Sequence, residues 1–245
     1  MDKDKLLNEK KSGWINISDE EKNKIFSFCD DYIKFMNKSK TEREAVKTVL
    51  VMLEEKGFKD INDVDSLKPN DKIYYINREK NVFSCVIGSD SIENGLNLVG
   101  SHIDSPRLDL KPNPVYEDNG FAYFKTHYYG GIKKYQWTTI PLSIHGVIVK
   151  PDGKKIDISI GEEENDPIFT ITDLLPHLSQ KQNELKLADA IKGEDLNILV
   201  GNMPLSSENG VKEHILEIIK EKYDFNEKDF LSAEIEMVPA FKAKS

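Results

Sequence analysis

The stretch Leu98-Val99-Gly100-Ser101-His102-Ile103-Asp104-Ser105-Pro106-Arg107-Leu108 does most to decide the fold. An apolar run ends here in a turn of small residues, and His102 follows, with Asp104 two positions later. We expect residues 96–100 to form a buried parallel strand, so that His102 leaves its carboxyl end, where open α/β sheets bind ligands. A neutral imidazole is a good zinc ligand, and a nearby carboxylate can accept its other N–H and fix the tautomer. The segment therefore predicts a metal site at the edge of an α/β sheet.

Length and composition are typical of a soluble globular protein. The 245 residues suffice for one large domain or two smaller ones, and 38% are hydrophobic and 31% charged. A net charge of -9 argues against a nucleic-acid partner held through its phosphates. We find no signal peptide and no apolar stretch long enough to cross a membrane. Cys29 and Cys85 lack zinc-finger or redox spacing, so we expect two small core residues in a cytoplasmic protein.

Two amphipathic helices are predicted near the start of the chain. Ser18 with Glu21, and Thr41 with Glu44, have the spacing of capping boxes. Apolar residues then recur at helical spacing, and Gly57 is typical of a helix end. We expect both apolar stripes to lie in the core: Ile25, Phe28, Tyr32, Ile33 and Met36 in the first helix, and Ala45, Val46, Val49, Leu50 and Leu53 in the second.

Strand signals dominate the rest of the chain. Residues 72–76 and 82–87 predict a hairpin, whereas Pro112-Asn113-Pro114 and Asp118-Asn119-Gly120 are turn signals. Beyond Gly120, apolar and alternating runs predict strands at 121–126, 138–150, 155–159, 196–200 and 231–238, and a helix at 211–220. The change in texture predicts a domain boundary near residue 108 and a return near 238.

The Gly-Ser-His-x-Asp-Ser-Pro core at residues 100–106 resembles a segment of the aspartyl aminopeptidase and aminopeptidase I family, exopeptidases with two zinc ions. Two further segments are similar to the glycine-rich segment and the next strand of that family: Tyr129-Gly130-Gly131-Ile132-Lys133-Lys134-Tyr135-Gln136-Trp137 and His145-Gly146-Val147-Ile148-Val149. Lys133 and Lys134 look closer to the bacterial aminopeptidase I branch, which leaves the preference for the N-terminal residue open.

The resemblance implies an α/β fold in which a zinc-exopeptidase-like catalytic domain is interrupted by a mainly β dimerisation domain. Residues 1–108 would begin the catalytic domain, 109–237 would form the inserted domain, and 238–245 would start the return. Family members are about twice as long, and most of their ligands follow the inserted domain. We therefore expect a shortened form: a fragment, an interrupted reading frame or a half-protein.

The resemblance also implies the site residues. His102 would bind zinc, and Asp104 would be a catalytic residue that orients the His102 ring. His177 matches a family histidine that is either a metal ligand or a substrate contact in the partner subunit's active site; from the sequence alone, a surface or interface histidine is the plainer interpretation. The acidic run at residues 162–164 predicts a solvated loop, because the glutamate pair of the family lies beyond the length of this chain. Three other histidines are expected to be structural or without a ligand partner: His127, His145 and His214.

Three functions remain open at this stage. The first is a metal-dependent aminopeptidase that releases N-terminal amino acids from peptides, with zinc as cofactor and a homodimer that assembles into a larger homo-oligomer. The second is a non-catalytic dimerisation or assembly module, because one histidine and one aspartate cannot hold two ions. The third, a carbohydrate-binding or other β-sandwich module, gives no account of the His102 segment.

Overall fold

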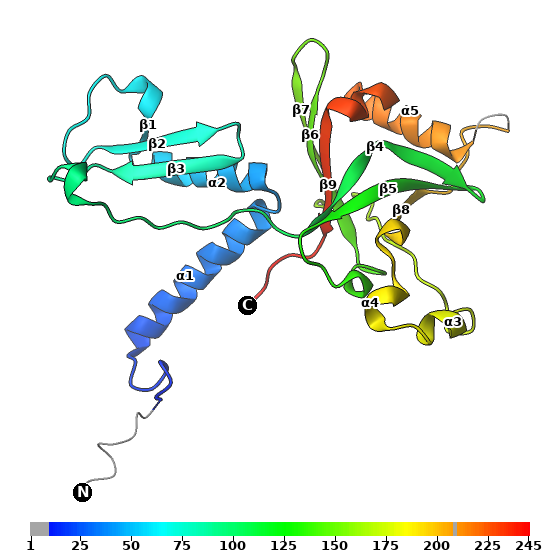
Figure 1. Cartoon of the computed structure of the whole chain (residues 1–245), viewed down its shortest axis with the longest axis horizontal. Coiled ribbons are helices and arrows are strands. Elements are labelled where there is room, and N and C mark those ends of the chain that lie inside the picture. Colours follow the sequence, from blue (N-terminus) through cyan, green and yellow to red (C-terminus); the bar gives the residue numbers. More distant parts are fainter. Residues whose placement is uncertain (1–9, 208–209) are drawn as a thin grey trace, which may run out of the picture.

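The computed structural model describes residues 10–207 and 210–245. The chain forms two bodies, an N-terminal one with two helices and a small sheet, and a larger one built on a six-stranded sheet (Figure 1). No helix in the part of the chain that is described is both long and apolar enough to cross a membrane.

The N-terminal body begins with α1 (Asp19–Lys38) and α2 (Glu42–Glu55). Both predicted capping boxes are confirmed: the side chains of Ser18 and Thr41 accept the backbone N–H groups of Glu21 and Glu44. Three strands in the order β1-β2-β3 follow: β1 (Lys59–Asp60), β2 (Lys72–Asn77) and β3 (Asn81–Val86). The predicted hairpin between β2 and β3 is confirmed by their antiparallel register.

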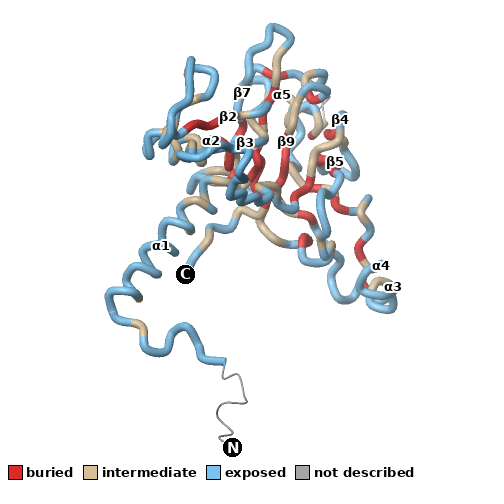
Figure 2. Tube along the Cα trace, turned by 60° about the vertical axis from the view of Figure 1, so that its left-hand side comes forward, coloured by how far each residue is buried: buried red, intermediate tan, exposed pale blue. Residues whose placement is uncertain are grey.

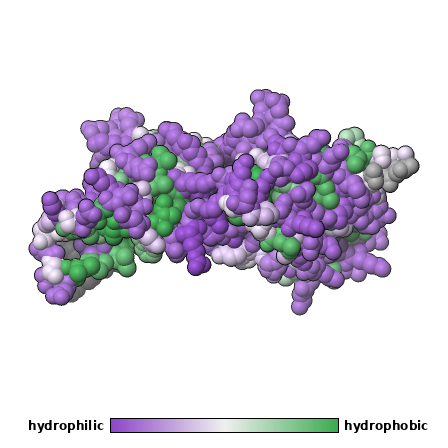
Figure 3. Space-filling model, turned by 90° about the horizontal axis from the view of Figure 1, so that it is seen from above, coloured by the Kyte–Doolittle hydropathy of each residue, from purple (hydrophilic) through white to green (hydrophobic). Residues whose placement is uncertain are grey.

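The apolar stripe of α1 is not in the core, contrary to the expectation from its spacing. No residue of α1 is buried, and Phe28 is 74% exposed. Both cysteines are exposed as well, which corrects their expected place in the core. Apolar side chains gather on the surface of this body (Figure 3). An amphipathic pattern predicts which face of a helix is apolar, but a second element must be present to cover that face.

The expected strand at residues 96–100 does not form. The segment is extended coil, and Leu98 and Val99 are 84% and 97% exposed. A parallel strand is stabilised by backbone hydrogen bonds to a neighbour. Among the described residues, β3 has no neighbour other than β2, so nothing pairs with residues 96–100.

The larger body contains a fully antiparallel sheet in the order β7-β6-β9-β4-β5-β8. Its strands are β4 (Arg107–Asp118), β5 (Phe121–Tyr129), β6 (Leu142–Val149), β7 (Lys155–Ile160), β8 (Ile198–Gly201) and β9 (Ala233–Pro239). Its helices are α3 (Gln180–Asn183), α4 (Leu187–Ala190) and α5 (Val211–Tyr223). Short 3-10 turns complete the chain at η2 (Ile61–Asp63), η3 (Ile92–Asn94), η4 (Lys134–Gln136), η5 (Gly193–Asp195) and η6 (Glu227–Ser232).

Strand β4 runs through Pro112-Asn113-Pro114, which the sequence predicts as a turn. The pairing of β4 with β5 shifts register between Leu110 and Val115, and the prolines lie inside this irregularity. Proline lacks the N–H that a regular ladder needs, and a bulge removes that need. The predicted turn at Asn119-Gly120 is confirmed, and both residues have positive φ, as a tight hairpin requires.

The main hydrophobic core lies in the larger body, where most of the buried residues are found (Figure 2). Leu108, Leu142, Ile148 and Met237 are 0% exposed. Gly146 lets β6 approach β9 closely, because a Cβ at this position would lie 2.1 Å from the backbone oxygen of Glu234. This well-packed sheet is the rigid support for the side chains described next.

Candidate active site

His102 and Asp104 lie side by side in the coil between the two bodies. The Nδ1 atom of His102 is 3.0 Å from Oδ1 of Asp104 and 3.0 Å from its backbone oxygen. Both partners are acceptors, so Nδ1 donates to them, and in the neutral ring the lone pair lies on Nε2. The His102 side chain is 84% exposed. The imidazole is thus available to a metal ion through Nε2.

The second oxygen of Asp104 is held by the larger body. The hydroxyl of Tyr129, at the end of β5, donates to Oδ2 of Asp104 over 2.8 Å. This hydrogen bond is the main cause that lowers the pKa of Asp104, with a further contribution from His102 and with partial desolvation acting against them. The carboxylate form is therefore favoured beside the imidazole. Tyr129 was not singled out from the sequence, where it appears only as the first residue of a glycine-rich segment.

The Tyr129 ring is stacked on a buried arginine. The guanidinium of Arg107 lies 4.0 Å from the ring centroid, within the range of a cation–π contact. Arg107 also donates to Glu42 of α2 over 2.6 Å and to Asp109 over 2.7 Å, and lies 3.5 Å from Glu236 of β9. The arginine therefore ties the first body to the sheet of the second.

Three carboxylates share this one guanidinium. Burial, followed by the charge of Glu42, raises the pKa of Glu236 to about 8, although Arg107 opposes the shift. One oxygen of Glu42 and one of Glu236 are buried and have no hydrogen-bond partner in the part of the chain that the structure describes. A single positive charge cannot compensate three negative ones at low dielectric, so the protonated form of Glu236 is favoured.

A second polar cluster joins the same two bodies around His145. This buried histidine lies between Glu44 at 2.6 Å and Glu162 at 3.0 Å, and Lys40 pairs with Glu162 at 2.6 Å. The expectation that Glu162 is solvated is wrong, since its side chain is 18% exposed; Glu163 and Glu164 are exposed as expected. Lys40 and Glu162 are 122 residues apart, so no local signal revealed the pair.

The other histidines lie elsewhere. His177 is exposed in a turn before α3, rather than in a helix. His127 is exposed and stacked on Tyr128, and Nδ1 of His214 lies 2.8 Å from the backbone oxygen of Met203. Within residues 10–207 and 210–245, no three His, Cys, Asp or Glu side chains come together as a metal site. The structure therefore does not place His177 in a cluster with His102.

The residues present do not by themselves fit a pair of zinc ions. Each ion needs at least three protein ligands, and a catalytic ion also needs an open position. At this site the described residues offer the outward-facing imidazole of His102, and the neighbouring carboxylate of Asp104 is already engaged by His102 and Tyr129. A complete site needs ligands from outside these residues.

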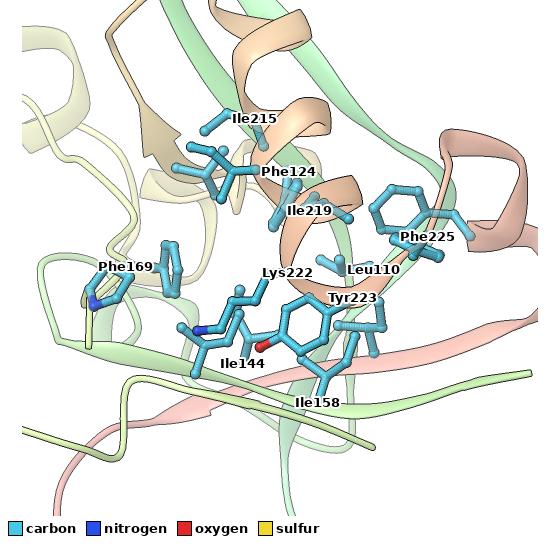
Figure 4. Close-up of a pocket in the computed structure, with 16 residues that line it drawn as sticks. Leu110, Phe124, Ile144, Ile158, Phe169, Ile215, Ile219, Lys222, Tyr223 and Phe225 are labelled. Atoms are coloured by element: carbon cyan, nitrogen blue, oxygen red, sulfur yellow. The ribbon is translucent and has the colours of Figure 1, made fainter. Parts of the chain in front are cut away.

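The larger body also has a partly open cavity of about 250 Å³ between α5 and the sheet (Figure 4). Its lining is almost entirely aliphatic and aromatic, including Phe124, Phe169 and Phe225, and Lys222 is its one charged residue. Apart from Lys222 and Tyr223, the described residues of its lining have no titratable side chain. We therefore assign it to packing between α5 and the sheet.

Comparison with known proteins decides the family. The family described as aminopeptidase I zinc metalloprotease (M18) matches residues 35–245. The chain belongs to the M18 family. A probable M18 family aminopeptidase 1 of Borrelia garinii is 51% identical over 96% of this chain and 52% of its own length. The corresponding protein of Clostridium acetobutylicum is 47% identical over 98% and 53%. A probable M18 family aminopeptidase 2 of Clostridium novyi is only 27% identical.

Solved structures of M18 proteins share the fold. A crystal structure of an M18 aminopeptidase from Thermotoga maritima has a TM-score of 0.90 and 47% identity, covering 96% of this chain and 52% of its own. A structure titled as the mApe1 dodecamer of S. cerevisiae has a TM-score of 0.63 at 19% identity, covering 88% and 48%, and shows the fold alone. This M18 chain spans about half the length of the curated relatives it matches. The mixed α/β class with two sheets is thus confirmed.

Proposed function

We propose that this chain supplies the first zinc ligand of a metal-dependent aminopeptidase that releases N-terminal amino acids from peptides. His102 is that ligand, through Nε2, and Asp104 is the residue that orients it. The remaining ligands of a two-zinc site come from outside the described residues. When bound, such zinc ions would supply Lewis-acid chemistry, by polarising a scissile carbonyl and acidifying a water.

The observation that carries the proposal is the geometry of the His-x-Asp pair in a chain of this family. A ligating histidine typically donates its other ring N–H to a carboxylate or a carbonyl, which fixes the tautomer and raises the basicity of the ligating nitrogen. Nδ1 of His102 is within hydrogen-bond distance of both kinds of acceptor, because Oδ1 of Asp104 and its backbone oxygen each lie 3.0 Å away.

The same proposal includes the architecture and the assembly. Residues 1–108 begin the catalytic domain, residues 109–237 form the inserted dimerisation domain, and residues 238–245 start the return. The consecutive strands β4–β9 support this division. Two copies pair through the larger body, and dimers assemble further; His177 then acts in the partner subunit's site, as a ligand or a substrate contact. Two unbridged cysteines support a cytoplasmic location.

Split-enzyme complementation tests the function. The purified chain is assayed on aminoacyl anilides with added zinc, alone and after mixing with the part of the Borrelia garinii relative that lies beyond the match. We expect turnover and tightly bound zinc in the mixture only. His102→Ala abolishes both, whereas His127→Ala, at an exposed histidine of β5, leaves both unchanged.

The assembly module is the second candidate, and it is favoured because residues 10–207 and 210–245 contain no cluster of three metal-ligating side chains. It predicts that the mixture has neither turnover nor tightly bound zinc while the chain still forms dimers in sedimentation. Turnover that survives His102→Ala would reject the role given to His102.

A further inference from the structure

The contact between Tyr129 and Asp104 links the sheet of the larger body to the His102 segment. Residues 96–106 are coil, and the His102 and Asp104 side chains are 84% and 35% exposed. Burial alone therefore fixes neither side chain. Tyr129, in contrast, is the last residue of β5 and is paired with Arg107 of β4 in the sheet register.

We propose that Tyr129 is a positioning residue for the metal site. Its hydroxyl holds Oδ2 of Asp104 at 2.8 Å, which turns Oδ1 toward Nδ1 of His102 and directs Nε2 outward. This inference rests on the proposed function, because the purpose of the arrangement is to present His102 to zinc. Tyr129 acts through Asp104.

The ring of Tyr129 is itself held in place. Arg107 stacks on the ring at 4.0 Å, and its guanidinium is fixed by hydrogen bonds to Glu42 and Asp109. The Arg107 side chain is 9% exposed, so this support is well ordered. A chain of direct contacts thus runs from helix α2, through Arg107, Tyr129 and Asp104, to the imidazole.

The consequence is that the larger body belongs to the site and is more than an assembly domain. A side chain in an exposed coil samples several rotamers, and a carboxylate with one free oxygen can rotate away from its histidine. A hydroxyl anchored on a strand removes that freedom. Losing an outer partner of a metal ligand typically lowers metal affinity or activity 10- to 100-fold. For Tyr129, one step further out, we expect about three- to tenfold.

The test compares Tyr129→Phe, which removes only the hydroxyl, with Tyr128→Phe on the same strand. The first measurement uses the chain alone, without metal, at about pH 8, where free histidine is neutral. In the parent, the two ring nitrogens of His102 should show widely separated 15N shifts, because one tautomer dominates. Tyr129→Phe should narrow that separation as the tautomers mix, and Tyr128→Phe should leave it unchanged.

The second measurement uses the complemented enzyme. Tyr129→Phe should lower kcat and zinc affinity about three- to tenfold while KM changes less than about twofold. Added to Asp104→Ala, it should have no further effect, because it acts through that carboxylate. Circular dichroism verifies the fold of each variant. Tyr129→Leu, which removes both the hydroxyl and the ring, is the second variant and should also lower kcat and zinc affinity.

The outcomes separate the two proposals. If His102→Ala is inactive but Tyr129→Phe matches the parent in 15N shifts and kcat, the positioning role is overturned and the function stands. If His102→Ala keeps full activity, the proposed function fails; narrowed 15N shifts in Tyr129→Phe would then still support the Tyr129–Asp104–His102 contact, and unchanged shifts would overturn it too. Additive losses in Tyr129→Phe combined with Asp104→Ala would contradict action through Asp104.

Discussion

The Nδ1 atom of His145 on β6 lies 2.6 Å from Oε1 of Glu44 on α2, across 101 residues of sequence. Burial alone would lower the pKa of His145, but the hydrogen bonds and charges of Glu44 and Glu162 outweigh it and raise the pKa above the ordinary 6.5. The contact between the two bodies thus favours the charged form of His145.

This contact predicts a pH-dependent stability. A raised pKa in the folded state gives stability that is complete below 6.5 and is lost as the pH rises through the folded value. We expect the free energy of unfolding in urea to fall over this window, and His145→Gln to flatten the fall. It should also destabilise the protein below pH 6.5 by roughly 3 kcal/mol, because Glu44 loses its buried partner. An unchanged slope in His145→Gln, or a flattened one in the control His127→Gln, would contradict this account.

Glu236 predicts a second pH dependence in a wider window. Its pKa is about 8 in the folded protein against 4.5 for the free group, so the unfolded chain binds fewer protons between these values. Stability therefore falls as the pH rises from 4.5 through about 8. The Glu236→Gln variant keeps the shape of the protonated form. It should be more stable than the parent at roughly pH 9, and the two proteins should differ little in stability at pH 4.5. Equal unfolding midpoints of the two proteins at the higher pH would show that the fold does not raise the pKa of Glu236.

Replacing Gly146 by alanine is expected to lower the stability of the protein strongly, although the polarity of the side chain does not change. A Cβ there would meet the Glu234 backbone oxygen at 2.1 Å and the Ile235 Cα at 2.8 Å, and φ is +155°. Because β6 and β9 would have to move apart, Gly146→Ala should cost on the order of 3 kcal/mol or more. Gly131→Ala is the matched control, since its Cβ would have open space. Urea unfolding of both variants is the measurement, and equal losses would reject the close approach.

Phe225 lines the apolar cavity, and its truncation is expected to lower the stability of the protein. It is 1% exposed and makes an edge-to-face contact with Phe230 at 4.6 Å. Phe225→Ala should lower the free energy of unfolding by about 3–5 kcal/mol, through lost burial and an enlarged void. The control Phe241→Ala removes a ring that is 58% exposed and should have a small effect. Similar thermal midpoints for the two variants would mean that the cavity collapses without cost.

Local signals in the sequence predicted local structure well. The two capping boxes, the β2–β3 hairpin and the Asn119-Gly120 turn depend on residues within a few positions of each other. The His-x-Asp pair belongs to the same class, because its two members are two residues apart. The turn predicted from Pro112 and Pro114 was wrong, because the outcome depends on pairing with another strand. The register shift between β4 and β5 leaves these prolines without a ladder hydrogen bond to donate.

Contacts between residues that are far apart in the sequence could not be predicted from local patterns. The polar neighbours of Glu162 predict a solvated side chain, whereas its partner Lys40 lies in the other body. Tyr129 reaches Asp104 only because β5 ends beside the coil. Burial of α1 and strand formation at residues 96–100 both depend on a second element to pack against, and the sequence of the segment itself does not say whether that element is present.

Strand β3 has a neighbour on one side only among the described residues, and Phe83 and Val86 on it are 64% and 54% exposed. An open strand edge presents a row of unused N–H and C=O groups to any extended peptide. Copies of the isolated chain are thus expected to associate by pairing at this edge of β3. The concentration of soluble monomer should therefore reach a plateau as the total protein concentration rises. Purification of the chain alone is best attempted dilute.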